Sequence, residues 1–132
     1  MIVDSSALVA LLLAEPGSER IERALLANPG SRLPAPCYLE VCMVMAGRFG
    51  PGARRQIDEI LRDLAIGLLS FTEEHARTAA DAFVRYGKGR HPAGLNFGDC
   101  MVYAVAMVEG APLLFTGEDF ARTDVAVAGG GG

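Results

Sequence analysis

Short apolar runs alternate along the chain with longer segments in which apolar and polar residues mix. The apolar runs predict short strands at residues 1–3, 31–36, 68–71, 112–115 and 125–127. The mixed segments predict helices at residues 5–15, 18–27, 37–50, 51–67, 73–87 and 99–110. This alternation indicates an α/β fold with a central, mainly parallel sheet of about four or five short strands flanked by helices.

The last of these helices has an unusual composition. From Cys100 onward it contains no charged residue until Glu109, so we expect it to be buried on nearly all sides. It nevertheless opens with a carboxylate, Asp99. In the helix before it, apolar spacing predicts an inner stripe formed by Ala76, Ala79, Ala80 and Phe83. In the first helix, Ser5 or Ser6 is the expected N-cap.

The length of 132 residues is enough for one domain, which we place at residues 1–128, followed by a flexible glycine tail at 129–132. The longest uncharged apolar runs are too short to span a bilayer. No basic region precedes the apolar start, so we expect no signal peptide and a cytoplasmic protein. Three cysteines, Cys37, Cys42 and Cys100, match no zinc spacing and indicate no disulfide framework.

Three acidic residues stand where predicted elements begin or end. Asp4 follows the first strand, Asp99 opens the buried helix, and Asp119 follows the strand at 112–115. Each also has an ordinary structural explanation, since acids stabilise helix N-termini and are common in turns. In parallel sheets, however, ligands bind beyond the carboxyl ends of the strands, where these acids are expected to meet.

A fourth acid, Glu40, lies inside the apolar segment "CYLEVCMVM". A glutamate buried in an apolar helix is costly unless it is paired or binds a metal, and no Lys or Arg lies within one helical turn of it. A divalent cation would satisfy Glu40 and also offset repulsion between neighbouring acids, because Mg²⁺ takes oxygen ligands. The four acids therefore suggest a shared metal site.

Four segments, in order, resemble the motifs of PIN-domain ribonucleases, above all the VapC toxins of bacterial toxin–antitoxin pairs. They are "MIVDSSALVALLLAE", "YLEVCMVMAGRFG", "YGKGRHPAGLNFGDCMVYAVA" and "PLLFTGEDFARTD". The resemblance runs from Met1 to about Val127. It implies a PIN-like fold, an endoribonuclease dependent on Mg²⁺ or Mn²⁺, a symmetric homodimer, and a small VapB-like antitoxin as partner. An arginine of that antitoxin would plug the acidic pocket.

The resemblance also assigns residues. It places the four acids of the metal and catalytic site on Asp4, Glu40, Asp99 and Asp119. Asp124 matches a recurrent acid that supports the site from outside, and Ser6 matches a small hydroxyl residue near the first acid. Glu118 stands where the family often has a neutral residue.

The net charge of the chain bears on whether RNA can be its substrate. A net charge of −4 argues against a protein that coats nucleic acid, but the four acids account for all of it. The predicted loop before Asp99 is basic, and the candidate RNA contacts in and beside it are Arg85, Lys88, Arg90 and His91. For His91, simple exposure is the alternative explanation.

The sequence leaves two alternative functions. A phospho-receiver domain shares the length, the α/β sheet and an acidic Mg²⁺ pocket, but it needs an acidic pair after the first strand and a late lysine. Here one Asp ends that strand and the only lysine is Lys88. A PIN-like binding module without nuclease activity is the second alternative.

With 51% apolar residues, some apolar surface should remain exposed for partners, and we expect an antitoxin groove between residues 16 and 50.

Overall fold

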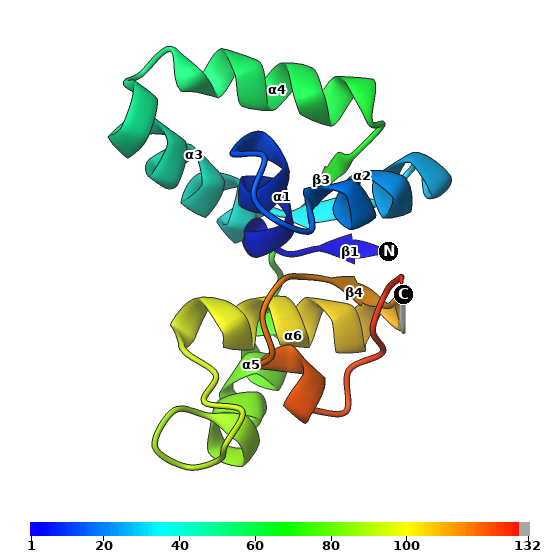
Figure 1. Ribbon diagram of the computed structural model, residues 1–132. Helices are drawn as coiled ribbons and strands as arrows, with labels where there is room; N and C mark the ends of the chain where they lie inside the picture. The colour runs from blue at the N-terminus through cyan, green and yellow to red at the C-terminus, as the bar shows by residue number, and fades with distance from the viewer. Residues whose placement is uncertain (130–132) are drawn as a thin grey trace.

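Four short parallel strands form the centre of the computed structural model, which describes residues 1–129 (Figure 1). They are β1 (Ile2–Val3), β2 (Arg32–Pro34), β3 (Gly67–Leu69) and β4 (Leu113–Leu114). Their order in the sheet is β3-β2-β1-β4, and every pairing is parallel. The expected strand at 125–127 makes only an isolated bridge between Val127 and Leu113. Of the predicted glycine tail, only Gly129 lies within the described residues.

In the described part of the chain, six α-helices surround this sheet. They are α1 (Ser5–Leu12), α2 (Ser18–Ala27), α3 (Ala35–Phe49), α4 (Ala53–Asp63), α5 (Glu73–Tyr86) and α6 (Phe97–Glu109). In the view of Figure 1, α3 and α4 lie at the top, α1 and α2 lie beside the strands, and α5 and α6 lie below β1 and β4. Covering a parallel sheet on both faces explains why β1 and β4 consist only of buried apolar residues. None of the helices in residues 1–129 is long and apolar enough to cross a membrane.

The neighbouring strands β1 and β4 end side by side. Val3 is paired with Leu114, and the Asp4 N–H donates to the Leu114 carbonyl at 2.9 Å. Just beyond, the Thr116 N–H donates to Ser6 Oγ at 3.0 Å. The start of α1 and the loop after β4 are therefore held together at the carboxyl edge of the sheet.

Several helix ends differ from the sequence-based predictions. The N-cap of α1 is Asp4, not Ser5 or Ser6, because the Asp4 carboxylate accepts the Ser6 N–H at 3.1 Å. Helix α4 ends at Asp63 rather than near Gly67, since Ala65 has a positive φ of 54° and turns the chain into β3. Helix α6 begins at Phe97, ahead of Asp99, because Asn96 caps it.

The inner stripe predicted for α5 is wrong in phase. Its buried residues are His75, Ala79, Ala82 and Tyr86, and only Ala79 belongs to the predicted set. The polar His75 enters the core because it completes a capping box: its Nδ1 accepts the Thr72 N–H at 3.0 Å, and its own N–H donates to Thr72 Oγ1 at 3.2 Å. Ala76, Ala80 and Phe83 are left on an outward apolar face.

The prediction for α6 holds more closely. Cys100 and every residue from Val102 to Ala106 are buried, whereas Met107 is exposed. The three cysteines are free thiols, and only Cys42 is partly exposed.

Candidate active site

Asp4 is the most buried of the four predicted acids. It follows β1 directly and caps α1, so both its backbone and its carboxylate are fixed. The pKa of Asp4 is raised to about 6: burial is the largest cause, the hydrogen bonds from Ser6 act in the opposite direction, and the Asp99 and Glu40 carboxylates add to the rise. Among the described residues, no cation pairs with Asp4 at salt-bridge distance.

Asp99 occupies the third position of α6 and is partly buried. Its carboxylate accepts the Asn96 N–H at 3.2 Å, while its own N–H donates to Asn96 Oδ1 at 2.9 Å. Burial raises the pKa of Asp99, and the nearby Asp119 and Glu40 carboxylates raise it as well. Asp99 therefore caps a helix, which is the ordinary structural explanation for an acid at this position, and it also lies near other acids.

The prediction that Glu40 is buried is wrong, because its side chain is exposed. The apolar residues beside it, Leu39 and Met43, are exposed too, so α3 is not the buried helix that its composition suggested. Glu40 still lies at the site: Ser5 Oγ donates a hydrogen bond to its carboxylate, and a Cβ placed on Gly98 would come within 3.5 Å of Glu40 Oε2. Glu40 therefore lies against the first turn of α6.

Asp119 lies exposed in the loop that follows β4. It precedes a 3-10 turn, Phe120–Arg122, and its side chain makes no capping hydrogen bond. Its neighbour Glu118 points to Arg122 across 3.7 Å in an exposed ion pair, which gives Glu118 a local partner of its own. Ser6 contributes to the site twice: its N–H donates to the Asp4 carboxylate, and its Oγ accepts the Thr116 N–H.

The four acids are close enough to influence one another. Asp4 feels the charges of Asp99 and Glu40, and Asp99 feels those of Glu40 and Asp119. Yet in residues 1–129 no three histidine, cysteine or acidic side chains are gathered tightly enough to hold one metal ion. The donor set, four carboxylates, suits a hard divalent cation. Three of the four accept hydrogen bonds from protein donors: Asp4 from Ser6, Asp99 from Asn96 and Glu40 from Ser5.

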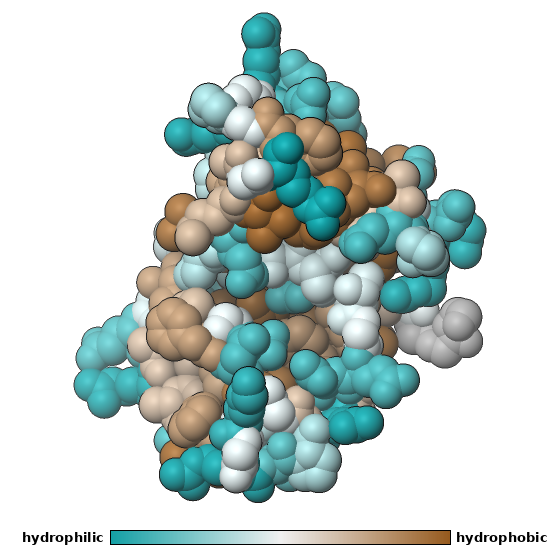
Figure 2. All heavy atoms as spheres, turned by 60° about the vertical axis from the view of Figure 1, so that its left-hand side comes forward, coloured by the Kyte–Doolittle hydropathy of each residue, from teal (hydrophilic) through white to brown (hydrophobic). Residues whose placement is uncertain are grey.

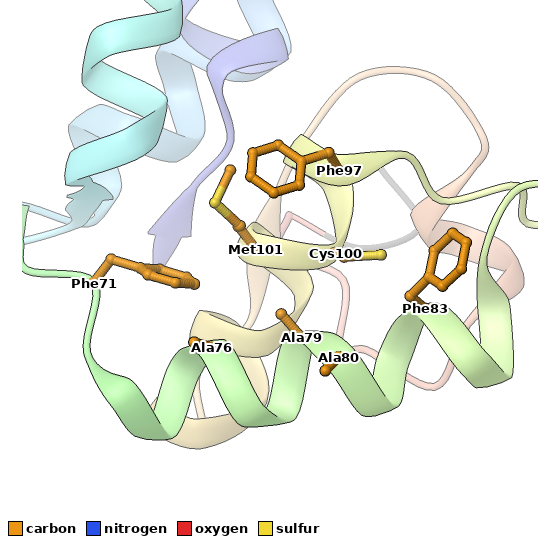
Figure 3. A pocket seen from close by; sticks show the side chains of 8 residues that line it. All are labelled: Phe71, Ala76, Ala79, Ala80, Phe83, Phe97, Cys100 and Met101. Carbon is orange, nitrogen blue, oxygen red and sulfur yellow. The ribbon is translucent and has the colours of Figure 1, made fainter.

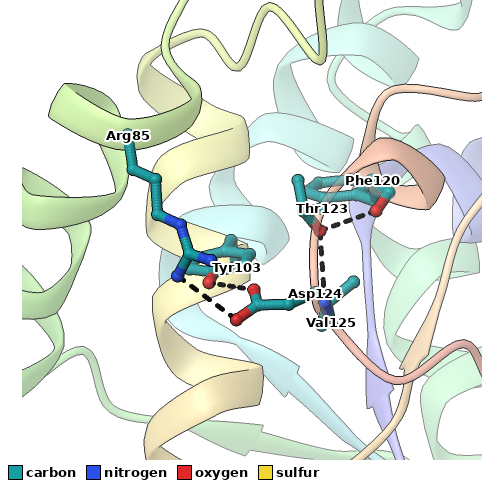
Figure 4. Close-up of polar contacts among 6 residues, drawn as sticks. All are labelled: Arg85, Tyr103, Phe120, Thr123, Asp124 and Val125. Carbon is teal, nitrogen blue, oxygen red and sulfur yellow. Dashed lines mark hydrogen bonds and ion pairs between the residues drawn. The ribbon is translucent and has the colours of Figure 1, made fainter. Parts of the chain in front are cut away.

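Asp124 is held by two neighbouring helices (Figure 4). Tyr103 Oη on α6 donates a hydrogen bond to it, and Arg85 Nη1 on α5 lies 3.4 Å from its other oxygen. The hydrogen bond from Tyr103 and the charge of Arg85 lower the pKa of Asp124. Arg85, predicted as an RNA contact, is therefore already paired, although its side chain remains 64% exposed.

The other basic candidates lie in the loop between α5 and α6. Lys88 and Arg90 are exposed, and the Arg90 guanidinium lies 5.5 Å from the Phe83 ring centroid. His91 is partly buried: its Nδ1 accepts the Ala93 N–H at 3.0 Å, and its ring meets Tyr86 edge-on at 5.0 Å. His91 therefore helps to shape this loop.

Apolar hollows flank the N-terminal turn of α6, and the sequence did not predict them. One lies between α5 and α6 and is lined by residues of both helices, among them Phe97, Cys100 and Met101 of α6 and Ala76, Ala79 and Ala80 of α5 (Figure 3). The other lies between α3 and α6 and includes Glu40 and Gly98. Phe97, 82% exposed, borders both. Figure 2, which brings the left-hand side of Figure 1 forward, shows apolar side chains gathered on this face among hydrophilic ones.

Comparison with known proteins identifies the family. Residues 1–126 match the PIN domain family. The chain belongs to the PIN-domain family. A curated relative, Ribonuclease VapC of Mycolicibacterium smegmatis, is 46% identical over 126 residues, covering 96% of this chain and 98% of the relative. Ribonuclease VapC30 of Mycobacterium tuberculosis is 45% identical, with 96% of each chain covered.

Several solved structures have the same fold at lower sequence identity. VapC20 of Mycobacterium tuberculosis, described as a Sarcin-Ricin loop cleaving toxin, aligns with a TM-score of 0.76 at 18% identity, over 95% of both chains. A toxin–antitoxin complex from Klebsiella pneumoniae aligns with a TM-score of 0.74 at 19% identity, over 97% of this chain and 96% of the other. The predicted PIN-like fold and the family resemblance are confirmed, and the phospho-receiver alternative is wrong.

Proposed function

We propose that this PIN-domain protein is a VapC-type toxin, an endoribonuclease that hydrolyses RNA phosphodiester bonds with the help of a divalent cation. The proposal is supported by close relatives that carry the name ribonuclease VapC. The observation that carries it within this chain is the mutual proximity of Asp4, Asp99 and Glu40 at the carboxyl edge of β1 and β4. Buried or neighbouring carboxylates without a cation partner are costly, and such groups concentrate at functional sites.

In this proposal Asp4 and Asp99 hold the cation, with Glu40 and Asp119 as further ligands, direct or through water. Mg²⁺ or Mn²⁺ bound there would supply activation of water and neutralisation of negative charge for phosphodiester hydrolysis. The chain's own residues do the rest. Asp4, Asp99 and Glu40 each use one carboxylate oxygen to accept a hydrogen bond from Ser6, Asn96 or Ser5, and the other oxygen of each would be offered to the cation. Lys88 and Arg90, both exposed, are placed to bind RNA phosphates.

The proposed partners are a small VapB-like antitoxin and a second copy of this chain. Structures of toxin–antitoxin complexes with this fold support the first. The exposed apolar surface around Phe97 offers room for a partner, although only the α3 wall of it belongs to residues 16–50, where we expected the antitoxin. The homodimer, the arginine plug and the cytoplasmic location stay predictions.

A cleavage assay on end-labelled RNA tests the proposal. Purified protein with Mg²⁺ should cut internal phosphodiester bonds, and Asp4→Asn and Asp99→Asn should not. Sequencing the ends of the cut RNA would name the target and the bond. If both variants cut RNA as fast as the wild type, the cleavage comes from another nuclease in the preparation. That result would contradict the proposal.

One observation favours a second candidate, a PIN-domain binding module without nuclease activity. Within residues 1–129 the acids are not assembled into a metal site as they stand. A gel-shift measurement run beside the cleavage assay separates the two functions. RNA bound by the wild-type protein but left intact at every Mg²⁺ and Mn²⁺ concentration would favour the binding module.

A further inference from the structure

Resting on the proposed function, we infer that Tyr103 is a positioning residue for the metal site: with Arg85 it holds Asp124, and through Asp124 it fixes the turn that carries Asp119 against the helix that carries Asp99. These three residues, Arg85, Tyr103 and Asp124, are called here the Asp124 cluster.

The first step is that residues 119–125 form one compact turn. The Asp119 carbonyl accepts the Arg122 N–H at 3.3 Å, and the Phe120 carbonyl accepts both the Thr123 N–H and Thr123 Oγ1. Thr123 Oγ1 in turn accepts the Val125 N–H at 3.2 Å (Figure 4). Asp119 and Asp124 therefore belong to the same small unit, and fixing one end of it restrains the other.

The second step is where this unit is attached to α6. Tyr103 follows Asp99 by four residues, so the two side chains lie on the same face of the helix one turn apart. Tyr103 is buried, and its ring meets Tyr86 at 5.6 Å between centroids, which fixes the direction of its hydroxyl. The hydrogen bond from Tyr103 Oη to Asp124 thus links the turn of Asp119 to the helical face of Asp99.

The third step is that this link works against a repulsion. Asp99 and Asp119 are close enough for the charge of one to act on the other. Asp119 is exposed and has no hydrogen-bonded partner for its side chain among residues 1–129, so nothing local keeps its carboxylate beside Asp99. The hydrogen bond from the buried Tyr103 goes to an ionised acceptor, the stronger kind of hydrogen bond, and it opposes the separation of the two acids.

The fold contains a matched control. Tyr38 Oη donates to Asp58 Oδ1 at 2.6 Å, and Arg54 Nε donates to Tyr38 Oη at 3.1 Å. The same three residue types therefore meet at a second place. This second cluster joins α3 to α4; Glu40 lies on α3, but neither Asp99 nor Asp119 lies on either helix. Removing the hydroxyl of Tyr38 or of Tyr103 should cost similar stability but differ in its effect on metal binding.

The test is titration of Mn²⁺ alone, followed by its paramagnetic resonance signal, into wild type, Tyr103→Phe and Tyr38→Phe, with thermal melts recorded without metal. We expect Tyr103→Phe to weaken Mn²⁺ binding by roughly 10-fold, the usual effect of losing a residue that orients a ligand. Tyr38→Phe should bind Mn²⁺ like the wild type. Asp124→Asn, which keeps an acceptor for Tyr103 but loses the pairing with Arg85, should fall between them, and it replaces Tyr103→Phe if that variant does not fold.

Two results would overturn the inference, and they can be told apart. If the wild type and Tyr103→Phe bind Mn²⁺ equally, the Asp124 cluster is only structural, while the proposed function stands. If the wild type binds no Mn²⁺, the metal site itself is wrong and the role of Tyr103 is lost with it.

Discussion

The four acids fall into a buried pair and an exposed pair. Asp4 and Asp99 stand at the end of a strand and in the first turn of a helix, and each accepts a backbone N–H. Glu40 and Asp119 are exposed, one on the outer side of α3 and one in a loop. Burial raises the pKa of both members of the first pair. The position of the buried pair is set by the fold, whereas the exposed pair depends on side-chain rotation and on loop contacts.

This difference indicates how the roles are divided. A carboxylate whose charge is costly without a cation contributes most to binding one, because the cation removes both the desolvation penalty and the repulsion. Exposed carboxylates are already solvated and gain less. We therefore expect the buried pair to decide whether metal binds and the exposed pair to tune how well.

The largest effect is expected for Asp4→Asn. The amide keeps an oxygen for the Ser6 N–H but loses the charge, so cleavage should fall by more than about 100-fold, beyond the loss typical of residues outside the ligand set. Without metal, the melting temperature should be unchanged or higher, since a buried charge has been removed. A strongly lowered melting temperature would show that Asp4 acts structurally and would break the division proposed here.

Asp99→Asn should follow closely, with cleavage reduced by about 100-fold. Its amide oxygen can still accept the Asn96 N–H, so only the favourable interaction with the helix N-terminus is lost, roughly 0.3–1 kcal/mol. Chemical denaturation and RNA cleavage should be measured on the same preparation. A normally folded variant that cuts RNA at the wild-type rate would reduce Asp99 to a helix-capping residue.

Glu40→Gln should reduce cleavage by roughly 10-fold and leave the unfolding midpoint unchanged. The side chain is exposed, and the amide oxygen can still accept the hydrogen bond from Ser5. The dependence of cleavage on Mg²⁺ tests this role. If Glu40 tunes the affinity for metal, the loss of cleavage in Glu40→Gln should shrink as the Mg²⁺ concentration is raised. A loss as deep as that of Asp4→Asn at saturating Mg²⁺ would place Glu40 with the buried pair.

Asp119→Asn is expected to have the smallest effect, a loss of several-fold up to about 10-fold in cleavage with no change in stability. Its neighbour provides the control. Glu118→Gln changes the adjacent charge, which is paired with Arg122, and should cut RNA at the wild-type rate. Equal losses in the two variants would mean that the charge of the loop matters and the position of Asp119 does not.

The sequence predicted best those features that depend on short-range order. Asp4 was correctly placed because an apolar strand ended directly before it, and α6 because an uncharged stretch of its length must be buried. The burial of Glu40 was wrong, since apolar neighbours such as Leu39 and Met43 proved to be exposed surface, and no local pattern separates a core from a partner face. The phase of α5 was wrong because His75 is polar, yet is buried by its capping role.

Contacts across long sequence distances were beyond the reach of the sequence. The bonds of Asp124 to Tyr103 and Arg85 span 21 and 39 residues, and each partner alone has ordinary surroundings in the sequence. The resemblance to the family drew attention to Asp124 but could not name what holds it. The apolar hollows around Phe97 likewise exist only because α3, α5 and α6 meet.

The measurement that tests the central claim most directly is RNA cleavage by EDTA-treated protein as Mg²⁺ is added back, for wild type and Asp4→Asn side by side. If the buried acids hold a catalytic cation, metal-free wild type should be inactive, Mg²⁺ should restore it in a saturable way, and Asp4→Asn should stay inactive over the same range. Undiminished cleavage by the metal-free wild type, or the same Mg²⁺ response in Asp4→Asn, would contradict the account.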